Sequence, residues 1–105
     1  MTGSIRLDAH QHFWANPNAL PWMTDELKVI RKSFLPQDLG PLLAEAGFDG
    51  SIAVQADHSL DETQWLLDEA AEQSWIRGVV GWVDLCSEDV ERDLDSFSNR
   101  SKLCG

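Results

Sequence analysis

The sequence has 105 residues, of which 43% are hydrophobic and 25% charged, and a formal net charge of −10, which suits a single domain with a packed core. Because this acidic surplus repels phosphate backbones and anionic membrane surfaces, we expect neither nucleic acid nor a membrane as partner. The sequence shows no membrane-spanning apolar run and no secretory signal, so we expect a cytoplasmic protein in which Cys86 and Cys104 are reduced packing residues.

Three short apolar runs rich in β-branched residues predict strands over residues 5–9, 51–56 and 76–83. A helical pattern follows each of these runs, so the predicted order of elements is β-α-β-α-β-α. Such alternation predicts an α/β fold with a parallel sheet, right-handed crossovers and helices that cover both faces of the sheet.

Each predicted helix carries start or stop signals. Pro36 suits the first position of a helix, and Gly47 can end that helix in the left-handed conformation. Ser59 and Glu62 match a capping box that opens the second helix. Ser87 is expected to cap the third helix, whose acidic first turn is favoured by the helix dipole. These signals predict one amphipathic helix after each strand.

The connection over residues 14–35 is longer than usual between a strand and its helix. It contains Pro21 and Trp22, followed by a short helical turn around Leu27 and Ile30, so we expect an ordered segment. Two interpretations stay open for it: a lid or binding loop, or an insertion that covers the edge of the sheet.

Candidate chemistry concentrates between Asp8 and Trp14, at the carboxyl end of the first strand. Because side chains alternate along a strand, His10 and His12 should point to the same side, with Asp8 below them. Parallel α/β folds place their active sites at this end. Neutral imidazoles are good ligands for a divalent ion, and Asp8 is placed to orient one of them. The alternative is a solvated His-x-His pair on an edge strand.

The other two strands supply weaker candidates. Gln55 lies near the end of the second strand, on the opposite face from its apolar neighbours, where it can contact a substrate. Trp82 and Asp84 share one face at the end of the third strand and can form the wall and floor of a pocket. Alternatively, Trp82 fills the core and Asp84 caps the following turn. His58 is interpreted as a solvated or capping residue of the loop.

Several segments carry a resemblance to a known family. Residues 7–14 (LDAHQHFW), 54–56 (VQA), 62–67 (ETQWLL) and 78–85 (GVVGWVDL) occur in the same order as in the amidohydrolase-related family of fuconolactonase-like and rhamnonolactonase-like enzymes. The similarity extends over nearly the whole chain. The resemblance implies the first three β/α units of a (β/α)₈ TIM barrel and a hydrolase that opens a sugar lactone or related cyclic ester with water.

The resemblance also implies roles for individual residues. His10 and His12 would be the catalytic pair and would face the substrate or one divalent ion, zinc or manganese. Some lactonases of the wider family work without a metal, so a metal-free site is an equal alternative. Gln55, Trp82 and Asp84 are the candidates for contact with the substrate, a small sugar lactone.

The length of the chain departs from this family. A complete barrel needs ~250 residues and eight strands, whereas this sequence predicts three. We therefore expect residues 1–105 to be the N-terminal part of a single barrel domain, inactive by itself because the later ligands and the general base are missing. The alternative is a non-catalytic remnant or a binding or scaffolding module. The open edges of a truncated sheet favour self-association.

Overall fold

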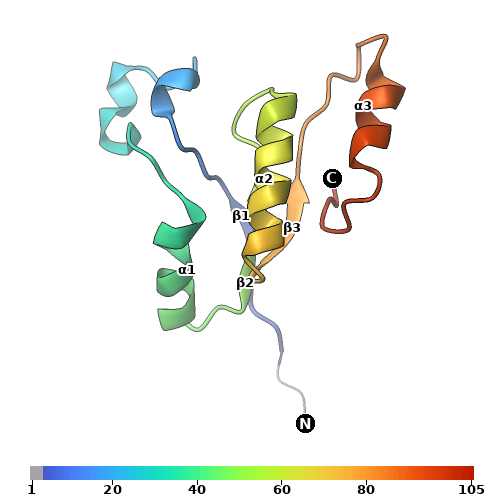
Figure 1. Ribbon diagram of the computed structural model, residues 1–105. Coiled ribbons are helices and arrows are strands. Elements are labelled where there is room, and N and C mark those ends of the chain that lie inside the picture. The colour runs from blue at the N-terminus through green and yellow to red at the C-terminus, as the bar shows by residue number, and fades with distance from the viewer. Residues whose placement is uncertain (1–3) are drawn as a thin grey trace.

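The computed structural model describes residues 4–105 as a sheet of three parallel strands with intervening helices (Figure 1). The strands β1 (Leu7–Gln11), β2 (Gly50–Val54) and β3 (Ile76–Val80) lie side by side in the order β1-β2-β3. The predicted α/β fold with parallel strands, corresponding to three β/α units of a TIM barrel, is therefore confirmed.

Helices follow each strand, as predicted. They are α1 (Pro36–Glu45), α2 (Leu60–Glu72) and α3 (Val90–Phe97). The long connection after β1 contains two short 3₁₀ helices, η1 (Pro17–Ala19) and η2 (Asp25–Ile30). The amphipathic pattern therefore located the three main helices correctly, and the long connection has regular structure of its own.

The predicted helix ends are correct in three cases, including the start of α1 at Pro36, and wrong in one. Gly47, with a φ of 85°, follows α1 in the left-handed conformation that glycine adopts without strain. Ser59 caps α2, because its hydroxyl accepts the N–H of Glu62 at 3.1 Å. Ser87 does not cap α3: its hydroxyl accepts the N–H of Asp89 at 3.0 Å in a turn that precedes the helix.

The helices cover only one face of the sheet, so the expectation of two covered faces is wrong. Because the strands follow one another in chain order, right-handed crossovers place α1 and α2 on the same side. Phe13, Ala53 and Val79 point to that side and are only 2%, 1% and 0% exposed. They pack in one core with Leu66, Leu67, Ala70, Ile76 and Phe97.

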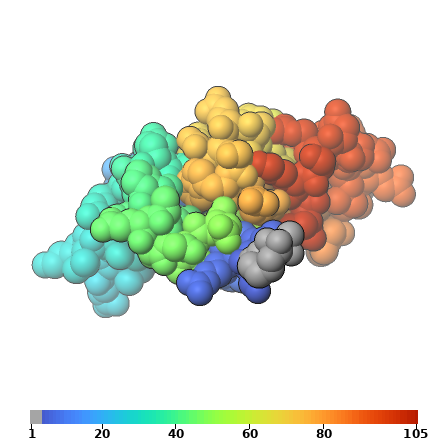
Figure 2. Space-filling view, turned by 90° about the horizontal axis from the view of Figure 1, so that it is seen from below, coloured from blue at the N-terminus to red at the C-terminus, as the bar shows by residue number. Residues whose placement is uncertain are grey.

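The molecule is correspondingly thin, with extents of 49 × 38 × 18 Å. An end-on view shows α2 on one side and the blue segment that contains β1 on the other (Figure 2). Beyond β3, the chain returns beside that strand: Val79 donates to the Lys102 carbonyl at 2.8 Å and accepts from Cys104 at 2.9 Å. Residues 102–104 therefore begin to pair with β3 as a fourth parallel segment of the sheet.

Two observations concern the expected environment of the chain. Among residues 4–105, no helix is long and apolar enough to span a membrane. Cys86 and Cys104 are free thiols, as expected, but both are exposed. Their predicted role as packing residues is therefore wrong.

Candidate active site

His10 and His12 converge at the carboxyl end of β1. Their Nε2 atoms lie 3.1 Å apart, and the two rings meet edge to face at 79°. The prediction that both side chains point to the same side is therefore confirmed. Nδ1 of His12 lies 3.0 Å from the carbonyl oxygen of Val54, and a carbonyl can only accept, so Nδ1 carries the proton. In the neutral ring, this leaves the lone pair of Nε2 directed toward His10.

Asp8 does not lie below the histidines, and that prediction is wrong. The register of β1 on β2 shifts between Asp8 and Gln11, as a β-bulge requires, and the extra residue interrupts the alternation of side chains. Gln11 is the partner of Ala53, on the face that the helices cover, and its amide donates to the Asp8 carboxylate at 2.6 Å. The Val54 carbonyl, instead of Asp8, orients His12.

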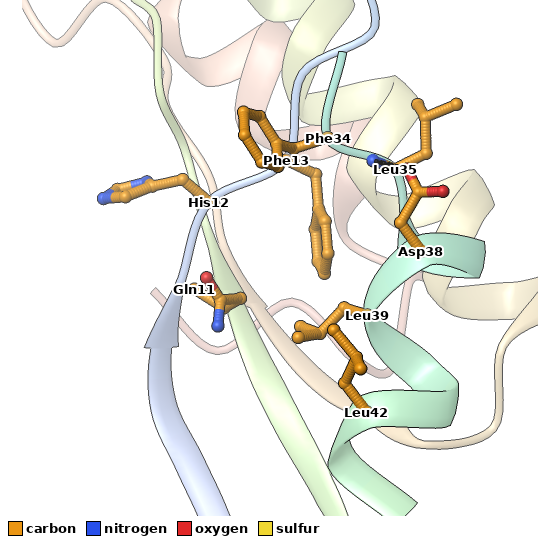
Figure 3. A pocket seen from close by; sticks show the side chains of 8 residues that line it. All are labelled: Gln11, His12, Phe13, Phe34, Leu35, Asp38, Leu39 and Leu42. Carbon is orange, nitrogen blue, oxygen red and sulfur yellow. Dashed lines mark hydrogen bonds between the residues drawn. The ribbon is translucent and has the colours of Figure 1, made fainter. Parts of the chain in front are cut away.

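An apolar pocket of about 190 Å³ lies between the end of β1 and α1 (Figure 3). Phe13 points into it toward Leu39, whereas the imidazole of His12 points away from α1. Phe34 and Leu42 complete the apolar wall. His12 is one of the residues that line the pocket, but its imidazole turns away from α1, toward the face on which the two histidines meet.

The long connection reaches the same end of the sheet as the histidines. Its two ends are joined at Trp14 and Phe34, whose main chains exchange hydrogen bonds of 3.0 and 2.9 Å. Within it, the Trp22 indole donates to the Ala56 carbonyl, just beyond β2, at 2.8 Å. This contact favours the interpretation as a loop that lies over the carboxyl ends of the strands.

Gln55 and Asp84 follow the expected strands but lie in different settings. Gln55 is half-buried just beyond β2, and its N–H donates to the Val80 carbonyl at 2.8 Å. Asp84 is exposed, and its carboxylate accepts the N–H of Cys86 at 2.9 Å. Asp84 therefore caps the turn after β3, as one of the two interpretations had it. Contact of either side chain with a substrate stays a prediction.

Trp82 forms an aromatic pair that the sequence analysis missed. Its ring stacks on the imidazole of His58 with centroids 5.6 Å apart and planes inclined by 15°. The main chain of Trp82 is fixed by the buried Thr63, whose hydroxyl accepts the Trp82 N–H and donates to the Trp82 carbonyl, both at 2.8 Å. The one available signal was that both aromatic rings follow adjacent strands, and so share one end of the sheet.

Glu62 is a second residue that acquires a new role in the structure. Its carboxylate reaches back to the strand end, where it accepts the N–H of Ala56 at 3.0 and 3.1 Å and the N–H of Asp57 at 3.1 Å. Burial raises the pKa of this carboxyl above its ordinary value, and the hydrogen bonds from Asp57 and Ala56 oppose the shift. His12 is close enough for its charge also to oppose that pKa shift.

The histidine pair is the candidate for metal binding in this part of the chain. In the region that the structure describes, residues 4–105, no three His, Cys, Asp or Glu side chains gather as a metal site would require. The separation of 3.1 Å between the two Nε2 atoms nevertheless suits two nitrogens bound to one zinc ion at about 2.0–2.1 Å each. The donor set fits two ligands of a larger site.

Comparisons with known proteins find relatives of this chain, although no family model matches it. L-Fucono-1,5-lactonase of Burkholderia ambifaria is 41% identical over 104 residues, which are 97% of this chain and 36% of that enzyme. L-Fucono-1,5-lactonase of Burkholderia multivorans is 43% identical over 84 residues, 79% of this chain and 28% of that enzyme.

A solved structure of similar sequence also has a similar fold over the matched region. The crystal structure of an amidohydrolase from Burkholderia multivorans with bound zinc superposes with a TM-score of 0.88 at 37% identity, over 97% of this chain and 36% of that one. The chain therefore spans about a third of the length of the relatives that it matches.

Proposed function

We propose that this chain hydrolyses a sugar lactone as part of a complete barrel. The proposal rests on its similarity to about a third of an L-fucono-1,5-lactonase and of an amidohydrolase. Residues 1–105 would form the N-terminal part of one barrel domain. The observation that carries the proposal is the convergence of His10 and His12, with Nε2 atoms 3.1 Å apart, at the carboxyl end of the first strand. The names of the relatives support a lactone such as L-fucono-1,5-lactone as substrate.

In this proposal, the chain supplies only part of the chemistry. Opening a lactone requires a water molecule, a base within about 3 Å of the proton that it accepts, and a group that stabilises the developing oxyanion. His10 and His12 would contribute to the last requirement through a bound divalent ion, because the His12 tautomer held by the Val54 carbonyl offers the Nε2 lone pair as a ligand. The family resemblance implies that the base and further ligands lie on later strands of the barrel.

We also propose that His10 and His12 bind one divalent ion, zinc or manganese, which would polarise the lactone carbonyl. The amidohydrolase that crystallised with zinc supports this assignment. Two nitrogens make a weak site, because catalytic zinc usually has three protein ligands. Calorimetric titration of the 105-residue chain with zinc should therefore show weak binding that does not saturate. Tight one-to-one binding that survives His10→Ala would contradict the assignment.

A chimera tests the proposed activity directly. The chain would replace the 36% of Burkholderia ambifaria L-fucono-1,5-lactonase that it matches, so that the relative supplies the remaining strands. We expect the folded chimera to release acid from L-fucono-1,5-lactone, and to bind zinc more tightly than the 105-residue chain. A chimera with the circular dichroism and melting behaviour of the relative, yet with no turnover of any sugar lactone, would refute the proposed function.

Adjacent residues at the carboxyl end of β1 supply a matched pair of variants for this chimera. His12→Ala should lower kcat by about a hundredfold, the scale of losing one electrostatic stabiliser. Gln11→Ala should change kcat by less than about threefold, because the Gln11 amide hydrogen-bonds Asp8 on the other face of the strand. Full activity of His12→Ala would remove the histidine pair from the mechanism.

Self-association of the 105-residue chain is a separate proposal. The β1 edge and the face opposite the helices carry main-chain groups and apolar side chains that are not covered within residues 4–105. Leu7 and Ile5, next to that edge, are both exposed. Size-exclusion chromatography with light scattering should show oligomers, and a sharp monomer peak with cooperative thermal unfolding would contradict the proposal.

We further propose a cytoplasmic location. It is supported by the free thiols of Cys86 and Cys104, since a reducing compartment keeps exposed cysteines unpaired. Cell fractionation with an antibody against the chain should recover it with cytoplasmic markers, and recovery in an oxidising compartment would overturn the assignment.

A further inference from the structure

The first turn of α2 contacts two neighbouring strand ends at once. Glu62 accepts the main-chain N–H groups of Ala56 and Asp57, which follow β2. The next residue, Thr63, holds Trp82, which follows β3, through both its N–H and its carbonyl. One helical turn therefore fixes the main chain just beyond both strands.

The side chain of Glu62 does not complete the capping box that its sequence position predicts. In that motif the glutamate would accept the N–H of the capping residue, Ser59. Ser59 does accept the N–H of Glu62 at 3.1 Å, but the Glu62 carboxylate passes Ser59 and bonds Ala56 and Asp57. The carboxylate thus stabilises the loop between β2 and α2 more than the helix itself. Its partial burial disfavours the charged form.

The segment that Glu62 holds, residues 56–58, connects two aromatic groups just beyond β2, the strand whose Val54 carbonyl accepts from His12. The Ala56 carbonyl accepts the Trp22 indole of the long loop at 2.8 Å. At the other end of the segment, His58 stacks on Trp82. Trp22, residues 56–58 and Trp82 therefore form a continuous rim, which begins in the loop that follows β1.

We propose that Glu62 is a positioning residue that fixes residues 56–58, and with them the aromatic rim, so that the rim determines how tightly a sugar lactone is held. This inference rests on the proposed lactonase function. Apolar and aromatic walls with a few oriented polar groups are typical of small-molecule sites. Loss of the Glu62 carboxylate would release Trp22 and His58 together, because both depend on the same short segment.

The competing explanation is that Glu62 only stabilises the start of α2. Ser59→Ala separates the two, because it removes the helix cap and leaves in place the hydrogen bonds that Glu62 accepts from Ala56 and Asp57. Glu62→Ala removes the bonds to the loop. Glu62→Gln keeps an oxygen acceptor at the same reach and should restore part of what Glu62→Ala loses.

Hydrogen exchange provides a readout that does not depend on activity. In the chimera described above, the amides of Ala56 and Asp57 should exchange at least about tenfold faster in Glu62→Ala, because the carboxylate is their bonding partner. In Ser59→Ala their exchange should be unchanged. Equal exchange at these two amides in Glu62→Ala and the parent would overturn the proposal.

Kinetics of the same variants test the consequence for the substrate. Glu62→Ala should raise KM for L-fucono-1,5-lactone by about tenfold with kcat within about threefold, and Ser59→Ala should change neither beyond about twofold. Equal changes in both variants would show a helix-stabilising role only and overturn the proposal. If the parent chimera has no activity, the proposed function fails, while the exchange of Ala56 and Asp57 still decides whether Glu62 positions the loop.

Discussion

The two faces of the sheet differ in how their side chains are used. On the face toward the helices, Phe13, Ala53 and Val79 are almost fully buried and pack in a single apolar core. On the opposite face, His10 is exposed, His12 is half-buried, and the apolar Ile52 is also only half-buried. In a complete barrel, the helix-covered face would be the outer wall and the face with the histidines would be the interior.

This difference indicates that the residues that stabilise the fold and the residues of the candidate site lie on opposite faces of the sheet. The covered face buries apolar area and supplies the free energy of folding. The uncovered face holds the polar groups of the candidate site and, within residues 4–105, has no packing partner. Substitutions on the first face should therefore alter unfolding, whereas substitutions on the second should alter chemistry.

The largest effect is expected from a substitution that disrupts packing on the helix-covered face. Leu66 of α2 is 1% exposed within the core, whereas Leu42 of α1 is 61% exposed. Leu66→Ala should lower the free energy of unfolding by about 2–5 kcal/mol, because it removes buried methyl groups and leaves a cavity. Leu42→Ala should cost less than about 0.5 kcal/mol. Urea unfolding of the chimera described above and of its two variants, followed by circular dichroism, measures both, and equal losses would contradict the assignment of the core.

A smaller effect is expected where the covered face meets the strand ends. Thr63→Val keeps the shape of the side chain but removes the hydroxyl that bonds the N–H and carbonyl of Trp82. The unpaired N–H should cost about 1–3 kcal/mol of unfolding free energy. Thr63→Ser keeps the hydroxyl and serves as the control. A Thr63→Val variant as stable as the parent would show that water replaces the hydroxyl.

Much of this division could be predicted from the sequence because it depends on periodicity. Alternation along the first strand placed His10 and His12 together, and helical spacing identified α1 and α2. The same reasoning failed for Asp8, because a β-bulge between residues 8 and 11 leaves no signal in the pattern of apolar residues.

Contacts between loops were also beyond prediction. The stacking of His58 on Trp82 and the hydrogen bond from Trp22 to Ala56 join residues that are far apart in the chain. The local sequence around each residue does not indicate such a partner. The role of Asp84 was left open between a pocket floor and a turn cap, and only the bond to Cys86 distinguished them. Local patterns fixed the elements, whereas the rim of the site depends on tertiary contacts.

The smallest expected effect concerns pH and the carboxyl of Glu62, which lies at the boundary of the two faces. Burial raises the pKa of this group above its ordinary value of 4.5 in the folded state. Between 4.5 and the raised pKa, the folded chain therefore binds more protons at this site than the unfolded chain. The stabilisation from this group is complete below pH 4.5 and is lost as the pH rises through the folded pKa.

Comparison with Glu62→Gln isolates that contribution, because glutamine does not titrate and the remaining groups, including Glu69 with its own raised pKa, are common to both chains. The difference in unfolding free energy, parent minus variant, should fall as the pH rises through this window and become constant above it. Urea unfolding of the chimera and of its Glu62→Gln variant at several values from about pH 4 to about pH 7 measures it. A difference that rises with pH would mean that the hydrogen bonds from Ala56 and Asp57 outweigh burial, and that the carboxylate is favoured in the folded state.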